Sequence, residues 1–264
     1  MRFLFGVLAV TALASSAFAD EATTAKAKAF VADHEKRIRP LDIKAGKAWW
    51  DANTTGKDED FKKKEEAQNE LDAALANPSA FAELKTLKKA KDDGKIDDKI
   101  FARAVDVLYL VYLEKQVESK LLQKITAKAN AVEQKFNVFR AKVGDREMKD
   151  SDVRKVLKES TDSAEREAVW AASKKVGADV EADLKELVKL RNEAAVQLGF
   201  KNFHEMTLFL NEQKGTDLIK LFDELDELTR EPFAKAKAEI DEKLAKRCGV
   251  KVADLMPWHY DDPF

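Results

Sequence analysis

The sequence has 264 residues, 36% of them charged, and its 47 basic and 49 acidic side chains leave a formal net charge of −2. This balance gives no general attraction to nucleic acid or anionic lipid, and the single cysteine, Cys248, excludes a disulfide within the chain. The charged fraction is well above the roughly 25% of ordinary domains, while glycine and proline are scarce, which is typical of long solvated helices. We therefore expect an all-α protein built from long antiparallel helices.

The first residues have the features of a secretory signal peptide. Arg2 supplies the positive charge, residues 3–14 form an apolar run, and Ala17-Phe18-Ala19 matches a cleavage site before Asp20. The run is shorter than the roughly 20 apolar residues that cross a bilayer, and no later stretch approaches that length. We expect residues 1–19 to be removed, and a mature chain without a membrane span to be exported to the periplasm or the cell exterior.

The first half of the mature chain is predicted to be helical. Between residues 21 and 52 apolar side chains recur at steps of three and four, in a helix that Pro40 should kink or divide. A turn at 53–56 separates it from charged helices over 61–75 and 80–91. Residues 100–122 are apolar around most of the helix circumference, which predicts a buried helix.

The second half continues the helical pattern. Gly144-Asp145 predicts a turn, and Asp150 the start of a helix. Asp162 is expected to cap a long helix that stops at Gly199. The last long helix should begin at Gly215 and be kinked by Pro232, and its apolar stripe consists of Leu218, Leu221, Phe222, Leu225 and Leu228.

A zinc hydrolase motif would read His-Glu-x-x-His, because that spacing places both imidazoles on one helix face beside a glutamate base. His204-Glu205-Met206-Thr207-Leu208 begins correctly but has Leu208 in place of the second ligand, and the stretch from His34 to Ile38 fails in the same way. With three histidines in all, we expect no metal site made within this chain.

Other residues with chemical potential are better interpreted as structural. Carboxylate runs such as 58–60, 223–224 and 261–262 are typical of solvated helix faces or caps. Cys248 has no histidine near it in sequence and is expected to be a small buried residue. The pair Trp49-Trp50 is expected in the core rather than as a ligand platform, and His259 in a structural corner formed by the aromatic residues 257–264.

Four stretches together resemble the angiotensin-converting enzyme family of zinc peptidyl-dipeptidases, in a bacterial version. They are residues 48–55 (Ala-Trp-Trp-Asp-Ala-Asn-Thr-Thr), residues 168–170 (Ala-Val-Trp) leading to Gly177, residues 191–203 with Leu-Gly-Phe-Lys-Asn-Phe, and the closing Leu255–Phe264. The closing motif is the most specific, whereas Leu-Gly-Phe-x-Asn-Phe is shared with thimet-type oligopeptidases. The resemblance covers nearly the whole mature chain.

The resemblance implies a helical fold whose two halves flank a deep channel, with residues 21–91 as the lid. It also implies release of dipeptides from the C-termini of peptides by a zinc-activated water. The family's zinc ligands and substrate-gripping residues would all lie beyond Phe264, so no catalytic, cofactor-binding or metal residue is assigned here. Ala171 stands where animal members have a chloride-binding arginine, which argues against chloride activation of that kind.

Two functional hypotheses remain open at this stage. In the first, residues 20–264 are the N-terminal part of a peptidyl-dipeptidase domain, truncated relative to the family, and bind no zinc and release no dipeptide on their own. In the second, the chain is an exported helical module that binds peptides or a partner protein without catalysis.

Overall fold

The computed structural model describes residues 20–260. These residues are almost entirely helical, as the composition predicts, and the strands among them form one short hairpin. The predicted signal peptide (residues 1–19) and the end of the aromatic stretch (residues 261–264) lie outside the described part. Within residues 20–260 we find no helix with the length and apolar character needed to cross a bilayer.

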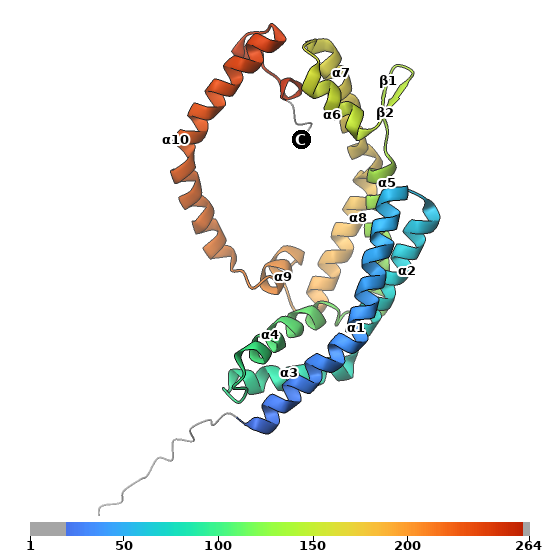
Figure 1. The fold of residues 1–264 in the computed structure, drawn as a ribbon, viewed down its shortest axis with the longest axis vertical. Coiled ribbons are helices and arrows are strands. Elements are labelled where there is room, and N and C mark those ends of the chain that lie inside the picture. The colour runs from blue at the N-terminus through green and yellow to red at the C-terminus, as the bar shows by residue number, and fades with distance from the viewer. Residues whose placement is uncertain (1–19, 261–264) are drawn as a thin grey trace, which may run out of the picture.

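Helices α1 (Glu21–Thr55) and α2 (Asp58–Leu75) lie side by side as an antiparallel pair (Figure 1). Asp20 caps α1 by accepting the backbone N–H of Ala22, and Gly56 ends it with a left-handed φ of 69°. Pro40 does not divide α1, contrary to one reading of the sequence. The residue is exposed, so water can satisfy the carbonyl that loses its helical donor.

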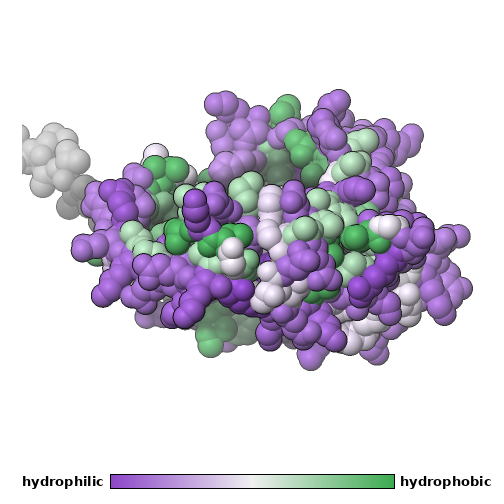
Figure 2. All heavy atoms as spheres, turned by 90° about the horizontal axis from the view of Figure 1, so that it is seen from above, coloured by the Kyte–Doolittle hydropathy of each residue, from purple (hydrophilic) through white to green (hydrophobic). Residues whose placement is uncertain are grey.

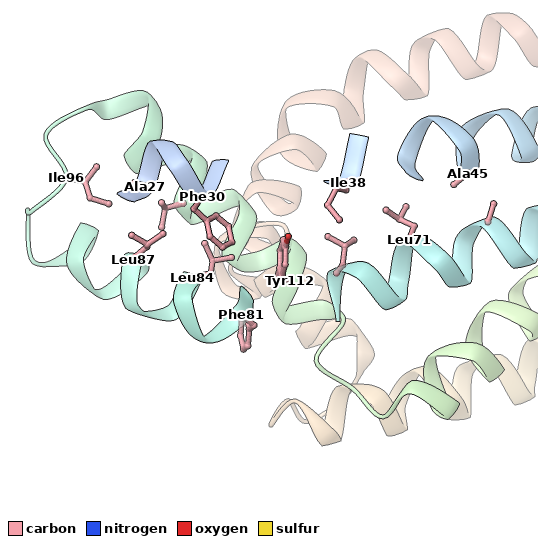
Figure 3. Close-up of a cluster of buried hydrophobic side chains, with 13 residues drawn as sticks. Ala27, Phe30, Ile38, Ala45, Leu71, Phe81, Leu84, Leu87, Ile96 and Tyr112 are labelled. Carbon is pink, nitrogen blue, oxygen red and sulfur yellow. The ribbon is translucent and has the colours of Figure 1, made fainter. Parts of the chain in front are cut away.

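Helices α3 (Pro78–Asp92) and α4 (Lys99–Glu114) close the end of this pair and create the main hydrophobic core. Figure 3 shows Phe30 of α1, Leu84 of α3 and Tyr112 of α4 converging at its centre. The rings of Phe30 and Tyr112 lie 6.1 Å apart, and Leu84 is fully buried. The core continues between α1 and α2 through Ile38 and Leu71.

The prediction of one buried helix over 100–122 is wrong in two respects. The segment divides between α4 and α5 (Ser119–Val138), and where α4 ends the side chain of Gln116 donates a hydrogen bond to the carbonyl of Tyr112 (3.0 Å). It is also only half buried, since α4 packs mainly on α3 and α1, with a smaller contact to α9. Ile100 is 78% exposed as a result.

The middle of the chain forms a second, smaller core. Strands β1 (Ala141–Val143) and β2 (Arg146–Met148) pair through the turn predicted at Gly144, and α6 (Asp150–Glu159) and α7 (Ser163–Lys174) pack beside them. The long helix predicted from residue 162 to 198 is instead two helices. α7 ends at Lys174, and α8 (Val176–Gln197) begins after Lys175. The Asp162 cap and the stop at Gly199 (φ 87°) are confirmed.

The last elements turn the chain into an open arc. After the short α9 (Phe203–Leu210), α10 (Gly215–Cys248) runs bowed and apart from the other helices, with Pro232 inside it (Figure 1). The 3-10 turns η1 (Val252–Asp254) and η2 (Pro257–His259) then bring the chain back against α7. Seen from above, the surface is mostly hydrophilic and broken by apolar patches (Figure 2).

Candidate functional site

A cavity of about 380 Å³ is lined by residues of the α1–α2 pair, the end of α4, and α5, α8 and α9. Its wall combines charged and apolar side chains, the usual mixture of a ligand pocket. Its lining includes Trp49, Lys64, Glu65, Asp72, Glu114, Lys115, Leu122, Ile125, Ala129, Asn130, Glu133, Arg191, Phe203 and Met206. The cavity thus joins the predicted lid helices to the predicted channel wall.

Glu133 on α5 links α5 to both α1 and α2. Its carboxylate accepts hydrogen bonds from Lys64 of α2 and from the Asn53 amide of α1, the latter at 2.8 Å. Burial alone would raise the pKa of Glu133, but the bonds from Lys64 and Asn53 and the charge of Lys64 outweigh it and hold the pKa below its ordinary value. Glu133 is therefore an ionised structural contact rather than a proton donor.

A second ion pair closes the other end of the cavity. Lys115 lies 3.2 Å from the buried carboxylate of Asp72 and 3.4 Å from Glu114. Burial alone would lower the pKa of Lys115, but the charges of Glu114 and Asp72 prevail and raise it. Neighbouring Asn130 donates to the Phe61 carbonyl at 3.0 Å, while its buried Oδ1 has no hydrogen-bond partner among the described residues.

Two charged groups of the cavity remain without an ion pair in the described part of the chain. They are Glu65 on α2 and Arg191 on α8. The Arg191 guanidinium carbon lies 5.1 Å from the centre of the Phe203 ring, within the range of a cation–π contact. The cavity thus offers one carboxylate and one guanidinium to a ligand.

The tryptophan pair is not in the core, so that prediction is wrong. Trp49 is 50% exposed at the edge of the cavity and Trp50 is 64% exposed. Adjacent residues of a helix point about 100° apart, so two neighbouring rings can share a core only where the buried face is wide. Trp49 is the residue of this cavity that sequence analysis placed wrongly, whereas Glu65 and Arg191 had no distinguishing pattern in so charged a chain.

His259 occupies a buried corner beside Ser163, as an apparent Ser–His pair. Its Nδ1 accepts the backbone N–H of Met256 at 2.8 Å, so the proton of the neutral ring must lie on Nε2. That Nε2 is 2.8 Å from the Ser163 hydroxyl and therefore donates to it. The ring cannot act as a base toward Ser163, and the predicted structural corner is confirmed for the described residues of this stretch.

Arg166 of α7 completes this corner. It is fully buried and donates to the backbone carbonyls of Ser160, Trp258, His259 and Tyr260 at 2.7–3.2 Å. Tyr260 in turn donates to Asp241 of α10 at 2.8 Å, and hydrogen bonds from Lys237 and Tyr260 lower the pKa of that carboxyl. The corner thus connects the C-terminal end of α10 to α7.

Comparison with known proteins decides the family. The family model described as angiotensin-converting enzyme, peptidase family M2, matches residues 21–257. The chain belongs to the angiotensin-converting enzyme family. A comparison with curated proteins found no match.

Members of the angiotensin-converting enzyme family are zinc peptidases, and the described residues do not offer that metal a site. Among residues 20–260 no three His, Cys, Asp or Glu side chains come together in a group that could hold a metal ion. His204 and Glu205 are exposed on α9, and His34 contacts Tyr112 on α4 at 3.1 Å. These residues do not fit a zinc centre, and the absence of bound zinc in the whole chain stays a prediction.

Cys248 is buried at the end of α10, as expected of a small structural residue. Of the other residues singled out by sequence, Asp58, Glu59 and Asp60 form the acidic first turn of α2, and Asp223 and Glu224 are exposed on α10. These placements confirm the interpretation as caps and solvated faces. The pair 261–262 lies outside the described residues.

Proposed function

We propose that residues 21–260 are the lid and first-half scaffold of a zinc peptidyl-dipeptidase, and that they do not release dipeptides alone. The lid is residues 21–91, which lie in α1–α3, and α5 with α8 forms the wall behind it. Membership of the angiotensin-converting enzyme family supports this assignment. The proposal includes export through the signal peptide at residues 1–19.

The observation that carries the proposal is the exposed apolar surface of α10. Large apolar side chains are between 42% and 73% exposed along this one helix: Ile219, Leu221, Phe222, Leu225, Leu228, Phe233 and Ile240. Contiguous apolar surface of this kind marks an interaction face. We infer that this face packs against the part of the peptidase that carries the zinc ligands.

Enzymatic assay of the purified chain, residues 20–264, tests the proposal directly. With added zinc and an N-blocked peptide, we expect no dipeptide release above a protein-free control. Turnover that a chelator abolishes would contradict the claim. The coding sequence that follows residue 264 is a second test, because we expect it to contain His-Glu-x-x-His in one of its reading frames.

The second candidate function is an exported binding module without catalysis, which the intact cavity favours. The two differ in how α10 behaves. If its apolar face awaits another part of the domain, the chain should bind an apolar dye such as ANS, and the double variant L225K/L228K should bind much less of it. The matched variant I43K, on the exposed face of α1, should leave dye binding unchanged. A self-sufficient module would melt cooperatively and bind little dye.

A further inference from the structure

The charges that line the 380 Å³ cavity do not all cancel within the protein. Lys64 pairs with Glu133, and Lys115 pairs with Asp72 and Glu114. Once these pairs are formed, Glu65 and Arg191 remain as one negative and one positive group without a partner among residues 20–260. A ligand that satisfied both would itself carry one positive and one negative charge.

The two groups belong to different helices that both pack on α5. Glu65 is on α2 and Arg191 is on α8, and each of these helices contacts α5. Because the two side chains form no ion pair with each other, they present their charges separately to the cavity. An ammonium group is the natural partner of the Glu65 carboxylate, and a carboxylate is the natural bidentate partner of the Arg191 guanidinium.

The remaining wall is apolar and suits the body of such a ligand. Leu122, Ile125 and Ala129 of α5 line the cavity, together with Met206 of α9 and the half-exposed ring of Trp49. A volume of about 380 Å³ is at the small end of the range for ligand pockets, roughly 300–1,000 Å³. The size therefore limits the ligand to a small molecule.

We propose that this cavity binds a small zwitterion with a free ammonium group, a free carboxylate and an apolar body, of the size of an amino acid or a dipeptide. Glu65 takes the ammonium end, Arg191 the carboxylate end, and the apolar wall with Trp49 the side chains. The site lies wholly within residues 20–260 and needs no metal. It therefore stands whether or not the chain is part of a peptidase.

Calorimetric titration of the chain, residues 20–264, tests this site with a chelator present throughout. The probes are leucine, alanyl-leucine, N-acetyl-alanyl-leucine and alanyl-leucine amide. We expect saturable binding of an unblocked probe, and about tenfold weaker binding when either charged end is blocked, the effect of losing one charge-assisted contact. The tighter of leucine and alanyl-leucine identifies the ligand as an amino acid or a dipeptide.

Substitutions locate the two ends of the ligand. R191M should weaken binding of alanyl-leucine about tenfold but leave binding of its amide unchanged, since the amide has already lost that contact. E65Q should behave in the same way toward the N-acetyl form. The matched variants R146M and E239Q, both at exposed positions, should bind like the unmodified chain.

Three results would overturn the proposal. They are the absence of saturable binding by every unblocked probe, equal binding of blocked and unblocked dipeptide, and additive losses from R191M and amidation. Circular dichroism of each variant establishes that the fold is retained. Because zinc is withheld, a failure here is distinct from a failure of the proposed peptidase role.

Discussion

Helices α1 and α10 have nearly the same design and opposite surroundings. They contain 35 and 34 residues, each has one internal proline, and each ends at a left-handed glycine. Yet α1 buries Phe30, Ile38 and a line of small residues against α2–α4, whereas α10 buries only Ala245 and Cys248 near its end. An apolar stripe thus specifies that a helix needs a partner, but not that the partner is within the described residues.

Phenylalanines on the two helices give the largest expected contrast. Phe30 on α1 is 5% exposed, so F30A should lower the free energy of unfolding by about 4 kcal/mol through lost burial and a cavity. Phe222 on α10 is 60% exposed, and F222A should change the free energy of unfolding by less than about 0.5 kcal/mol. Urea denaturation measures both. A large loss in F222A would mean that α10 is covered in solution, and the comparison would fail.

The next largest expected loss of stability concerns Arg166, whose side chain binds the backbone of residues 258–260 after α10. R166M should cost about 3 kcal/mol, because the buried carbonyls of residues 258–260 lose a donor that the apolar side chain cannot replace. Urea denaturation measures this cost, and hydrogen exchange should quicken at residues 256–260. R146M, an exposed arginine on β2, serves as the control. Equal stability of the two variants would show that α10 is held by other contacts.

Much of the fold was predictable because its signals are local. The caps at Asp162 and Gly199, the turn at Gly144 and the starts of α6 and α10 are each determined by a few adjacent residues, and each is confirmed. The boundaries inside apolar segments were not predictable. The break at residues 115–118 includes the side-chain hydrogen bond of Gln116 to the Tyr112 carbonyl. The spacing of apolar residues along the sequence does not predict such a contact.

The candidate cavity was largely unpredictable for the same reason. Its residues come from α1, α2, α4, α5, α8 and α9, and only the folded chain shows which of its many charges find partners. Glu65 and Lys64 are neighbours in sequence, but only Lys64 is paired, through Glu133 of α5. The exposure of Trp49 and Trp50 likewise depends on which helices pack around α1.

The hydroxyl of Tyr260 provides a finer test of how α10 is attached. Y260F removes the hydrogen bonds with Asp241 and Lys237 and should cost about 1 kcal/mol. Y109F is the matched control, since the ring of Tyr109 stacks on Phe81 and its hydroxyl has no hydrogen-bond partner within the described residues. Urea midpoints compare the two. If Y109F costs as much, the Tyr260 contact does not hold the helix.

The smallest expected effect is a pH dependence that belongs to α1 and is absent from α10, which contains no histidine. Burial against Tyr112, and then the charge of Arg37, lower the pKa of His34 from its ordinary value of 6.5. The unfolded chain therefore binds a proton more readily than the native one, so stability should be complete above pH 6.5 and fall as the pH drops through the native pKa of His34. Urea midpoints at pH 7.5 and 5.5 should differ for the unmodified chain and for H204Q, whose histidine is exposed, but much less for H34Q. If H34Q kept the full pH dependence of stability, a group other than His34 would be responsible. The pH dependence would then no longer distinguish α1 from α10.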